Sequence, residues 1–139
     1  MNRVGGVFGF IGLLCVLFLA SRPVLLAVVN RYRKADRTIP GQTKKLLQFV
    51  TRYHRFVGLA AFGLILLHAT LQYLRYDHIP AAGLVAGVLL LLQGALGFLM
   101  TKEKDKDKRK RMALGHRNMG IMLLVAILVH RIIGFLTTP

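Results

Sequence analysis

The chain is poor in cysteine and in acidic residues. Cys15 is the single cysteine among 139 residues, so no intrachain disulfide forms. No Gly-x-Gly-x-x-Gly segment follows a strand pattern, and no polar stretch is long enough to form a flavin or nicotinamide domain. Only five residues are Asp or Glu, and none of them lies inside a long apolar run. Divalent-metal transport sites prefer clusters of His, Asp and Glu, so this distribution disfavours them.

Long apolar runs are abundant. The sequence is 55% hydrophobic, and continuous runs cover 4–29, 56–74, 81–100 and 119–136. Each approaches or exceeds the roughly 20 residues that cross a hydrocarbon layer about 30 Å thick. The runs predict an all-α integral membrane protein, a four-helix bundle with helices at about 4–29, 53–76, 81–100 and 116–137. The helical spacing of Leu46, Leu47 and Val50 also predicts that a helix begins at Thr43 and continues through His54 into the membrane. We expect one domain over 1–139, in contact with the lipid bilayer and passing several times through the cell membrane.

Most of the positive charge lies in two segments. Of the 20 Lys and Arg residues, eight lie between Asn30 and Arg55 and eight between Thr101 and Arg117, with none from Tyr76 to Pro80. Cytoplasmic loops are rich in Lys and Arg. This distribution predicts two basic cytoplasmic loops with both termini outside. Topology and attraction to anionic lipids explain the net charge of +15 better than a nucleic-acid partner does.

The first apolar run also has features of a signal peptide. Arg3 precedes it, and the small residues Ala20 and Ser21 follow an apolar stretch. The apolar sequence continues from Pro23 to Val29, which favours a retained membrane helix.

Four histidines form two matched pairs. His54 and His68 are 14 positions apart, as are His116 and His130, so each pair lies on one helical face about 21 Å apart. A single membrane-spanning helix separates the two helices that carry these pairs, so the two run in the same direction. His54 is then level with His116, and His68 with His130. Ionisable side chains inside membrane helices are costly and generally functional.

Opposed imidazoles at two depths predict two haems. Neutral imidazole is a good iron ligand, and two of them fill both axial positions of a haem. His54 and His116 are expected to hold a cytoplasmic-side haem, and His68 and His130 an outer-side haem. No Cys-x-x-Cys-His segment occurs, which selects b-type over c-type haem. Because this ligation leaves no open position, it suits transmembrane electron transfer.

Residues near the histidines agree with haem binding. Glycines follow three of the four histidines by four positions, where the lack of a side chain leaves room for a flat macrocycle; they are Gly58, Gly120 and Gly134, while Gln72 breaks the pattern. Arginines directly follow three histidines and either hold haem propionates or anchor the helices at the interface; they are Arg55, Arg117 and Arg131. The same two alternatives apply to Arg22 near the inner interface.

Packing in a helix core is the main alternative role for these histidines. A lone His in an apolar helix is usually a packed core residue, but four in this register favour metal ligation. His78 has no matched partner, so the default is a surface histidine.

The segment Tyr-His-Arg-Phe-Val-Gly-Leu-Ala-Ala-Phe-Gly-Leu-Ile-Leu-Leu-His, ending at His68, resembles the ferric-reductase-like transmembrane family and the small cytochrome b561-type membrane cytochromes. The resemblance covers the second and fourth helices, under half of the chain. It implies electron transfer through two bis-histidine haems. The chain lacks the flavin and nicotinamide domain of full ferric reductases, so such an activity needs a separate reductase subunit.

The patterns leave three functions open. The first is an electron-transfer module with a soluble or membrane redox partner, for which the basic loops suit an acidic soluble donor. The second is a self-sufficient oxidoreductase acting on quinone, ferric iron or oxygen species, with a pocket near Tyr73, Tyr76 and His78. The third is a haem-free scaffold subunit. The oligomeric state stays open in each case.

Overall fold

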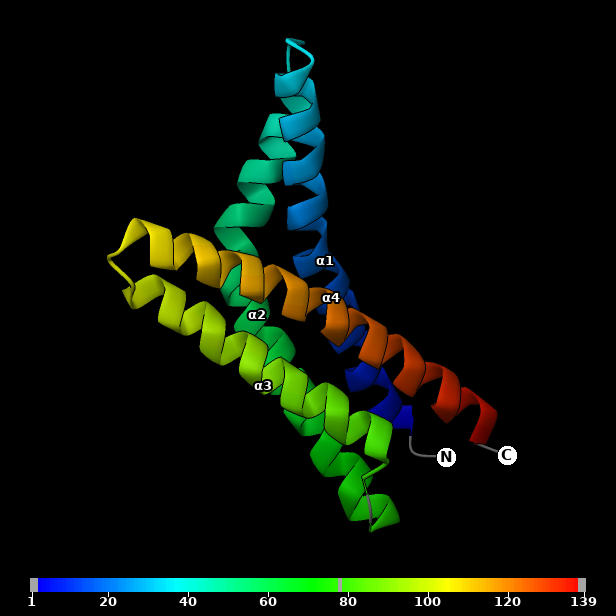
Figure 1. Cartoon of the computed structure of the whole chain (residues 1–139). Helices are drawn as coiled ribbons and strands as arrows, with labels where there is room; N and C mark the ends of the chain where they lie inside the picture. The colour runs from blue at the N-terminus through cyan, green and yellow to red at the C-terminus, as the bar shows by residue number, and fades with distance from the viewer. Residues whose placement is uncertain (1–2, 78, 138–139) are drawn as a thin grey trace.

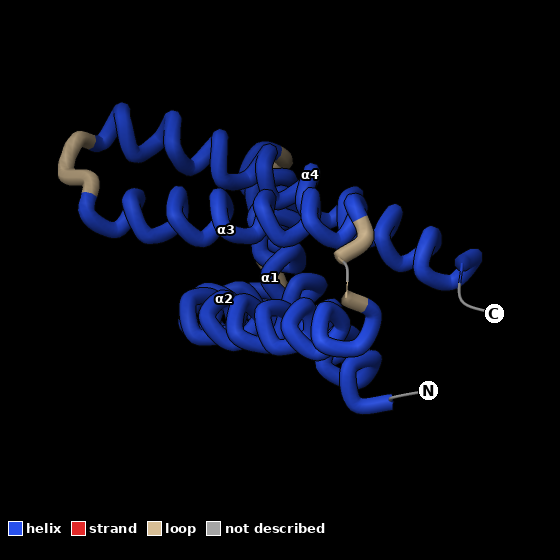
Figure 2. The backbone as a smooth tube through the Cα atoms, turned by 90° about the horizontal axis from the view of Figure 1, so that it is seen from below, coloured by secondary structure: helices blue, strands red, loops and turns tan. Residues whose placement is uncertain are grey.

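The protein is all-helical throughout the residues that the structure, a computed structural model, describes, namely 3–77 and 79–137. Its helices are α1 (Arg3–Lys34), α2 (Gly41–Tyr76), α3 (Ala81–Lys102) and α4 (Lys106–Thr137), and this part of the chain has no strand (Figure 1, Figure 2). All four are long and apolar enough to cross a membrane by length and composition. The predicted all-helical class with four candidate spans is confirmed.

The helices are arranged as two antiparallel hairpins. α1 packs along α2 and α3 along α4, whereas contacts of α2 with α3 and of α1 with α4 are sparse. Figure 1 shows that the hairpins cross each other instead of lying parallel. The first turn of α1 and the last turn of α4 lie at the lower right of this view, away from the α1–α2 and α3–α4 connections.

The basic segments are mostly helical, which differs from the expected loops. α1 continues to Lys34, and α4 begins at Lys106 instead of about 116. α2 begins at Gly41, ahead of the span predicted from about 53 and close to the helix start predicted at Thr43. The connections are therefore only 35–40 and 103–105. Lys and Arg are good helix formers, so a charged sequence beyond the apolar run continues the helix until a stop signal intervenes.

The helix ends have recognisable capping. At the end of α1, Asp36 has a φ of 50°, the Arg37 N–H donates to Tyr32 O at 3.0 Å, and the Asp36 N–H donates to Arg33 O at 3.2 Å. These two bonds form a Schellman motif. Asp77 ends α2 with a φ of 55°.

Large apolar side chains cover the outside of the molecule. Phe56, Leu59 and Leu74 are 70%, 72% and 75% exposed. The buried apolar side chains are few and small or branched, and among the described residues no polar side chain is buried; the apolar ones are Val16, Val29, Val50, Ala61, Ala86, Leu90 and Leu123. Such an apolar exterior matches a lipid environment, because contiguous exposed apolar surface of this extent is rare on soluble monomers.

Candidate functional site

The structure brings together the two histidine pairs that the sequence predicts. The ring centres of His54 and His116 are 6.4 Å apart with an interplanar angle of 65°. Those of His68 and His130 are also 6.4 Å apart, with an angle of 72°. All four side chains are partly buried. α2 and α4 therefore oppose imidazoles at two levels, although their hairpins make few other contacts.

The separation of the rings has the dimension of a two-imidazole metal centre. Two metal–imidazole bonds of about 2 Å each, together with the short distance from each nitrogen to its ring centre, add up to about 6 Å. Among the described residues no three His, Cys, Asp or Glu side chains gather. Each level thus offers two nitrogen ligands, the donor set that fills the axial positions of a haem.

In the outer pair, one tautomer is selected by a backbone contact. The Nδ1–H of His68 donates to the carbonyl oxygen of Gly5 in α1 at 2.8 Å. Metal-ligating histidines commonly make this bond with the nitrogen that does not bind the metal. It leaves the lone pair on Nε2 of His68 available for a ligand.

The inner pair is surrounded differently. The amide nitrogen of Gln93 in α3 donates to Nε2 of His116 at 3.3 Å. Within the described part of the chain, Nδ1 of His54, Nδ1 of His116 and Oε1 of Gln93 are buried without a hydrogen-bond partner. Buried polar atoms are nearly always paired, so this site is chemically incomplete as it stands. Ligation through Nε2 of His116 requires Gln93 to rotate away.

Three glycines that the sequence reasoning did not assign to the site pack directly against the histidines. A Cβ on Gly9 would lie 3.0 Å from Cε1 of His68. On Gly83 it would lie 3.1 Å from Cε1 of His130, and on Gly97 3.2 Å from Cε1 of His116. A signal was present in the sequence, because Gly83 and Gly97 are separated by the same 14 positions as the histidines of α4.

The glycines predicted to leave room for a macrocycle have different surroundings. A Cβ on Gly58 or on Gly134 would meet nothing within 4 Å, so the space beside them is open. A Cβ on Gly120 would lie 3.0 Å from the amide nitrogen of Gln93. The same Gln93 side chain therefore occupies the place beside both His116 and Gly120.

The predicted arginines do not gather at the histidines. Arg55, Arg117 and Arg131 are exposed. Arg22 of α1 is partly buried, and its Nε donates to Oγ1 of Thr51 at 3.4 Å, about one turn before His54. The ion pair found among the described residues is between Lys108 and Glu103, so Arg22 has no carboxylate partner there.

The pocket predicted at the outer turn involves Tyr73, Tyr76 and His78. Tyr73 and Tyr76 are 49% and 47% exposed, and His78 lies outside the described residues.

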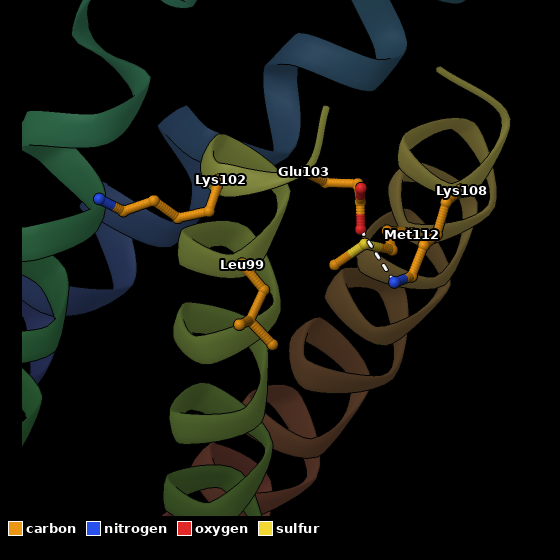
Figure 3. Close-up of a pocket in the computed structure, with 5 residues that line it drawn as sticks. All are labelled: Leu99, Lys102, Glu103, Lys108 and Met112. Atoms are coloured by element: carbon orange, nitrogen blue, oxygen red, sulfur yellow. Dashed lines mark ion pairs between the residues drawn. The ribbon is translucent and has the colours of Figure 1, made fainter. Parts of the chain in front are cut away.

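Two hollows lie at the basic ends of the hairpins. Figure 3 shows the one between α3 and α4, lined by Leu99, Lys102, Glu103, Lys108 and Met112. Lys108 pairs with Glu103 at 3.1 Å, and the backbone N–H of Asp105 together with Lys108 lowers the pKa of the Glu103 carboxyl. The second hollow, at the end of α1, is lined by Val28, Arg31, Tyr32, Ala35 and Arg37. Neither lining includes a histidine.

Comparison of the chain with protein-family models, with curated proteins and with solved structures finds no match. The geometry of the histidine pairs therefore carries the functional argument.

Proposed function

We propose that this protein transfers electrons across a membrane through two b-type haems, each held by one histidine of α2 and one of α4. The observation that carries the proposal is the equal ring separation of 6.4 Å in the two pairs. An accidental packing of four histidines has no reason to repeat one distance at two levels. Haem b bound at these pairs would supply one-electron iron chemistry, and the two histidines of each pair would hold it.

The surrounding residues fit this cofactor. Gly9, Gly83 and Gly97 let α1 and α3 approach the rings closely, which holds the imidazoles in place. The open space beside Gly58 accommodates part of a planar group. Arg22 offers a guanidinium without a carboxylate partner, the counter-ion that a propionate next to the inner pair needs. Arg55, Arg117 and Arg131 serve as interfacial anchors or as further propionate contacts.

The two levels divide the path across the membrane. His54 and His68 are separated by about 21 Å of helix, so each electron step is shorter than the hydrocarbon layer. Following the bias of Lys and Arg toward the cytoplasm, the inner pair faces the cytoplasm and both termini lie outside in the cell membrane. A soluble or membrane-bound redox partner, or quinone, supplies or accepts the electrons.

The decisive experiment is haem stoichiometry, measured by pyridine haemochrome on detergent-purified protein. We expect two b haems per chain in the wild type and about one in each of the variants His54→Ala and His68→Ala, because each loses one ligand of one pair. His78→Ala is the matched control, since His78 has no partner at the 14-residue interval.

Each result separates the possible functions. Colourless wild-type protein from haem-replete cells would reject the electron-transfer proposal in favour of a scaffold. Haem that persists at two per chain in both variants would reject the assigned ligands. If the isolated, reduced protein is reoxidised by quinone or ferric iron, it is a self-sufficient oxidoreductase and needs no partner for that step.

A further inference from the structure

The hollow at the end of α1 has the composition of an anionic lipid site, and we propose that it binds the headgroup of an anionic phospholipid. Its lining combines two guanidinium groups, Arg31 and Arg37, with the phenol of Tyr32 over the apolar residues Val28 and Ala35. Arginine binds phosphate through paired N–H groups, and tyrosine adds a hydroxyl donor at the membrane interface.

Local backbone geometry builds this hollow. The Schellman motif at Asp36 turns the chain back, so Arg37 comes beside Tyr32 although five positions separate them. Side chains at these two motif positions often touch, and both line the hollow. Arg31, directly before Tyr32 in the last turn of α1, joins them. Arg31 thus belongs to the helix end, and the backbone of Arg37, in the connection that follows, is held to it by the hydrogen bond to Tyr32 O.

No acidic side chain lines the α1 hollow, which distinguishes it from the α3–α4 hollow. In the latter, Glu103 already neutralises Lys108 at 3.1 Å (Figure 3). The lining of the α1 hollow, by contrast, carries two positive charges and no negative one. It therefore attracts an anion that the protein itself does not provide.

The depth of the hollow suits a lipid. The candidate span of α1 has 30 residues and that of α3 has 22, lengths of about 45 Å and 33 Å. A helix longer than the hydrocarbon layer is expected to tilt, which would bring the end of α1 toward the headgroup layer.

An apolar strip leads to the arginines. Val24 and Val28 are 62% and 38% exposed on the same face of α1, one turn apart. An acyl chain lying along this strip places its phosphate beside Arg31 and Arg37. A second copy of this chain is disfavoured as occupant, because each copy carries a net charge of +15.

The test is calorimetric titration of the detergent-solubilised full chain with dioctanoyl-phosphatidylglycerol, and separately with dioctanoyl-phosphatidylcholine and inorganic phosphate. Salt at about 0.5 M shortens the screening length to about 4 Å and suppresses general attraction to the basic surface. We expect saturable binding of dioctanoyl-phosphatidylglycerol with one-to-one stoichiometry. Dioctanoyl-phosphatidylcholine and inorganic phosphate are each expected to bind at least about ten-fold more weakly.

Variants locate the site. Arg31→Gln with Arg37→Gln is expected to weaken binding about 10- to 30-fold. Lys104→Gln with Lys110→Gln removes the same charge from exposed positions of the other basic segment and is expected to leave binding unchanged. Arg31→Lys with Arg37→Lys keeps the charge and the fold but loses paired N–H donation, so it is expected to bind more weakly than wild type.

The proposal is overturned by equal loss in the two Gln double variants, by unchanged binding in the Lys double variant, or by inorganic phosphate binding as tightly as the lipid. The last result would indicate a site for a free anion. If the wild type binds none of the three ligands, the lipid site is rejected, and an acidic protein partner becomes the alternative.

Discussion

At the scale of single residues, glycine contacts set how close the neighbouring helices come to the imidazoles. Gly83 of α3 faces His130, and an added Cβ would lie 3.1 Å from its ring. Gly87 is one turn further along the same helix, and an added Cβ there would meet nothing within 4 Å. The two positions therefore separate the effect of a methyl group at the site from its effect on the helix.

Gly83→Ala is expected to weaken haem binding at the outer pair by about five-fold, because the ring must shift by a few tenths of an ångström, and such overpacking typically costs about 1 kcal/mol or more. Gly87→Ala is expected to leave haem content unchanged. Haem titration of the purified variants measures the difference. Equal effects of Gly83→Ala and Gly87→Ala would mean that Gly83 does not contact the His130 ligand.

At the scale of one element, the start of α4 depends on a side-chain cap. Oδ1 of Asp105 accepts the backbone N–H groups of Asp107 at 2.8 Å and of Lys108 at 3.0 Å. These bonds lower the pKa of the Asp105 carboxyl below its ordinary value of 3.8. An N-cap aspartate satisfies donors that the helix itself leaves unpaired.

Asp105→Ala is expected to fray the first turn of α4, seen as faster amide hydrogen exchange at Asp107 and Lys108. Asp105→Asn, which keeps an acceptor oxygen, is the control and should retain protection.

The pH dependence of this cap has a definite sign. Because the folded pKa of Asp105 is the lower one, its contribution is complete above the unfolded pKa of about 4 and is lost as pH falls through the folded value. Protection of the first turn should therefore fall in acid in the wild type. In Asp105→Asn it should not respond over the same range.

At the scale of the whole molecule, few contacts join the two hairpins: some lie between α2 and α3 and between α1 and α4, and the two histidine pairs face each other between α2 and α4. Contacts within each hairpin are extensive and contacts between hairpins are sparse. If each haem joins α2 to α4, ligation supplies much of the connection between the hairpins.

Replacing all four proposed histidine ligands by alanine is expected to leave helix content unchanged but to broaden the distribution of distances between the hairpins. Spin labels at Leu74→Cys and Leu136→Cys, both 75% exposed, with Cys15 replaced by alanine, report that distance by pulsed electron resonance. Helix content is followed by circular dichroism. A distance distribution as narrow as that of the haem-loaded protein would show that side-chain packing alone holds the hairpins.

The sequence by itself determined the helical class, the number of candidate spans and the pairing of the histidines. Apolar run length predicts spans, and the 14-residue interval places each pair on one face. The start of α4 was placed less well, since its basic segment carries no periodic signal that separates a helical end from a loop.

Only the tertiary structure decided which residues surround the rings. The contacts of Gly9 with His68, of Gln93 with His116 and of Arg22 with Thr51 join different helices. Such contacts depend on the rotation and crossing of packed helices, which spacing along one chain segment does not encode. The exposure of Arg55, Arg117 and Arg131, by contrast, follows from geometry within one helix, because neighbours along a helix point about 100° apart.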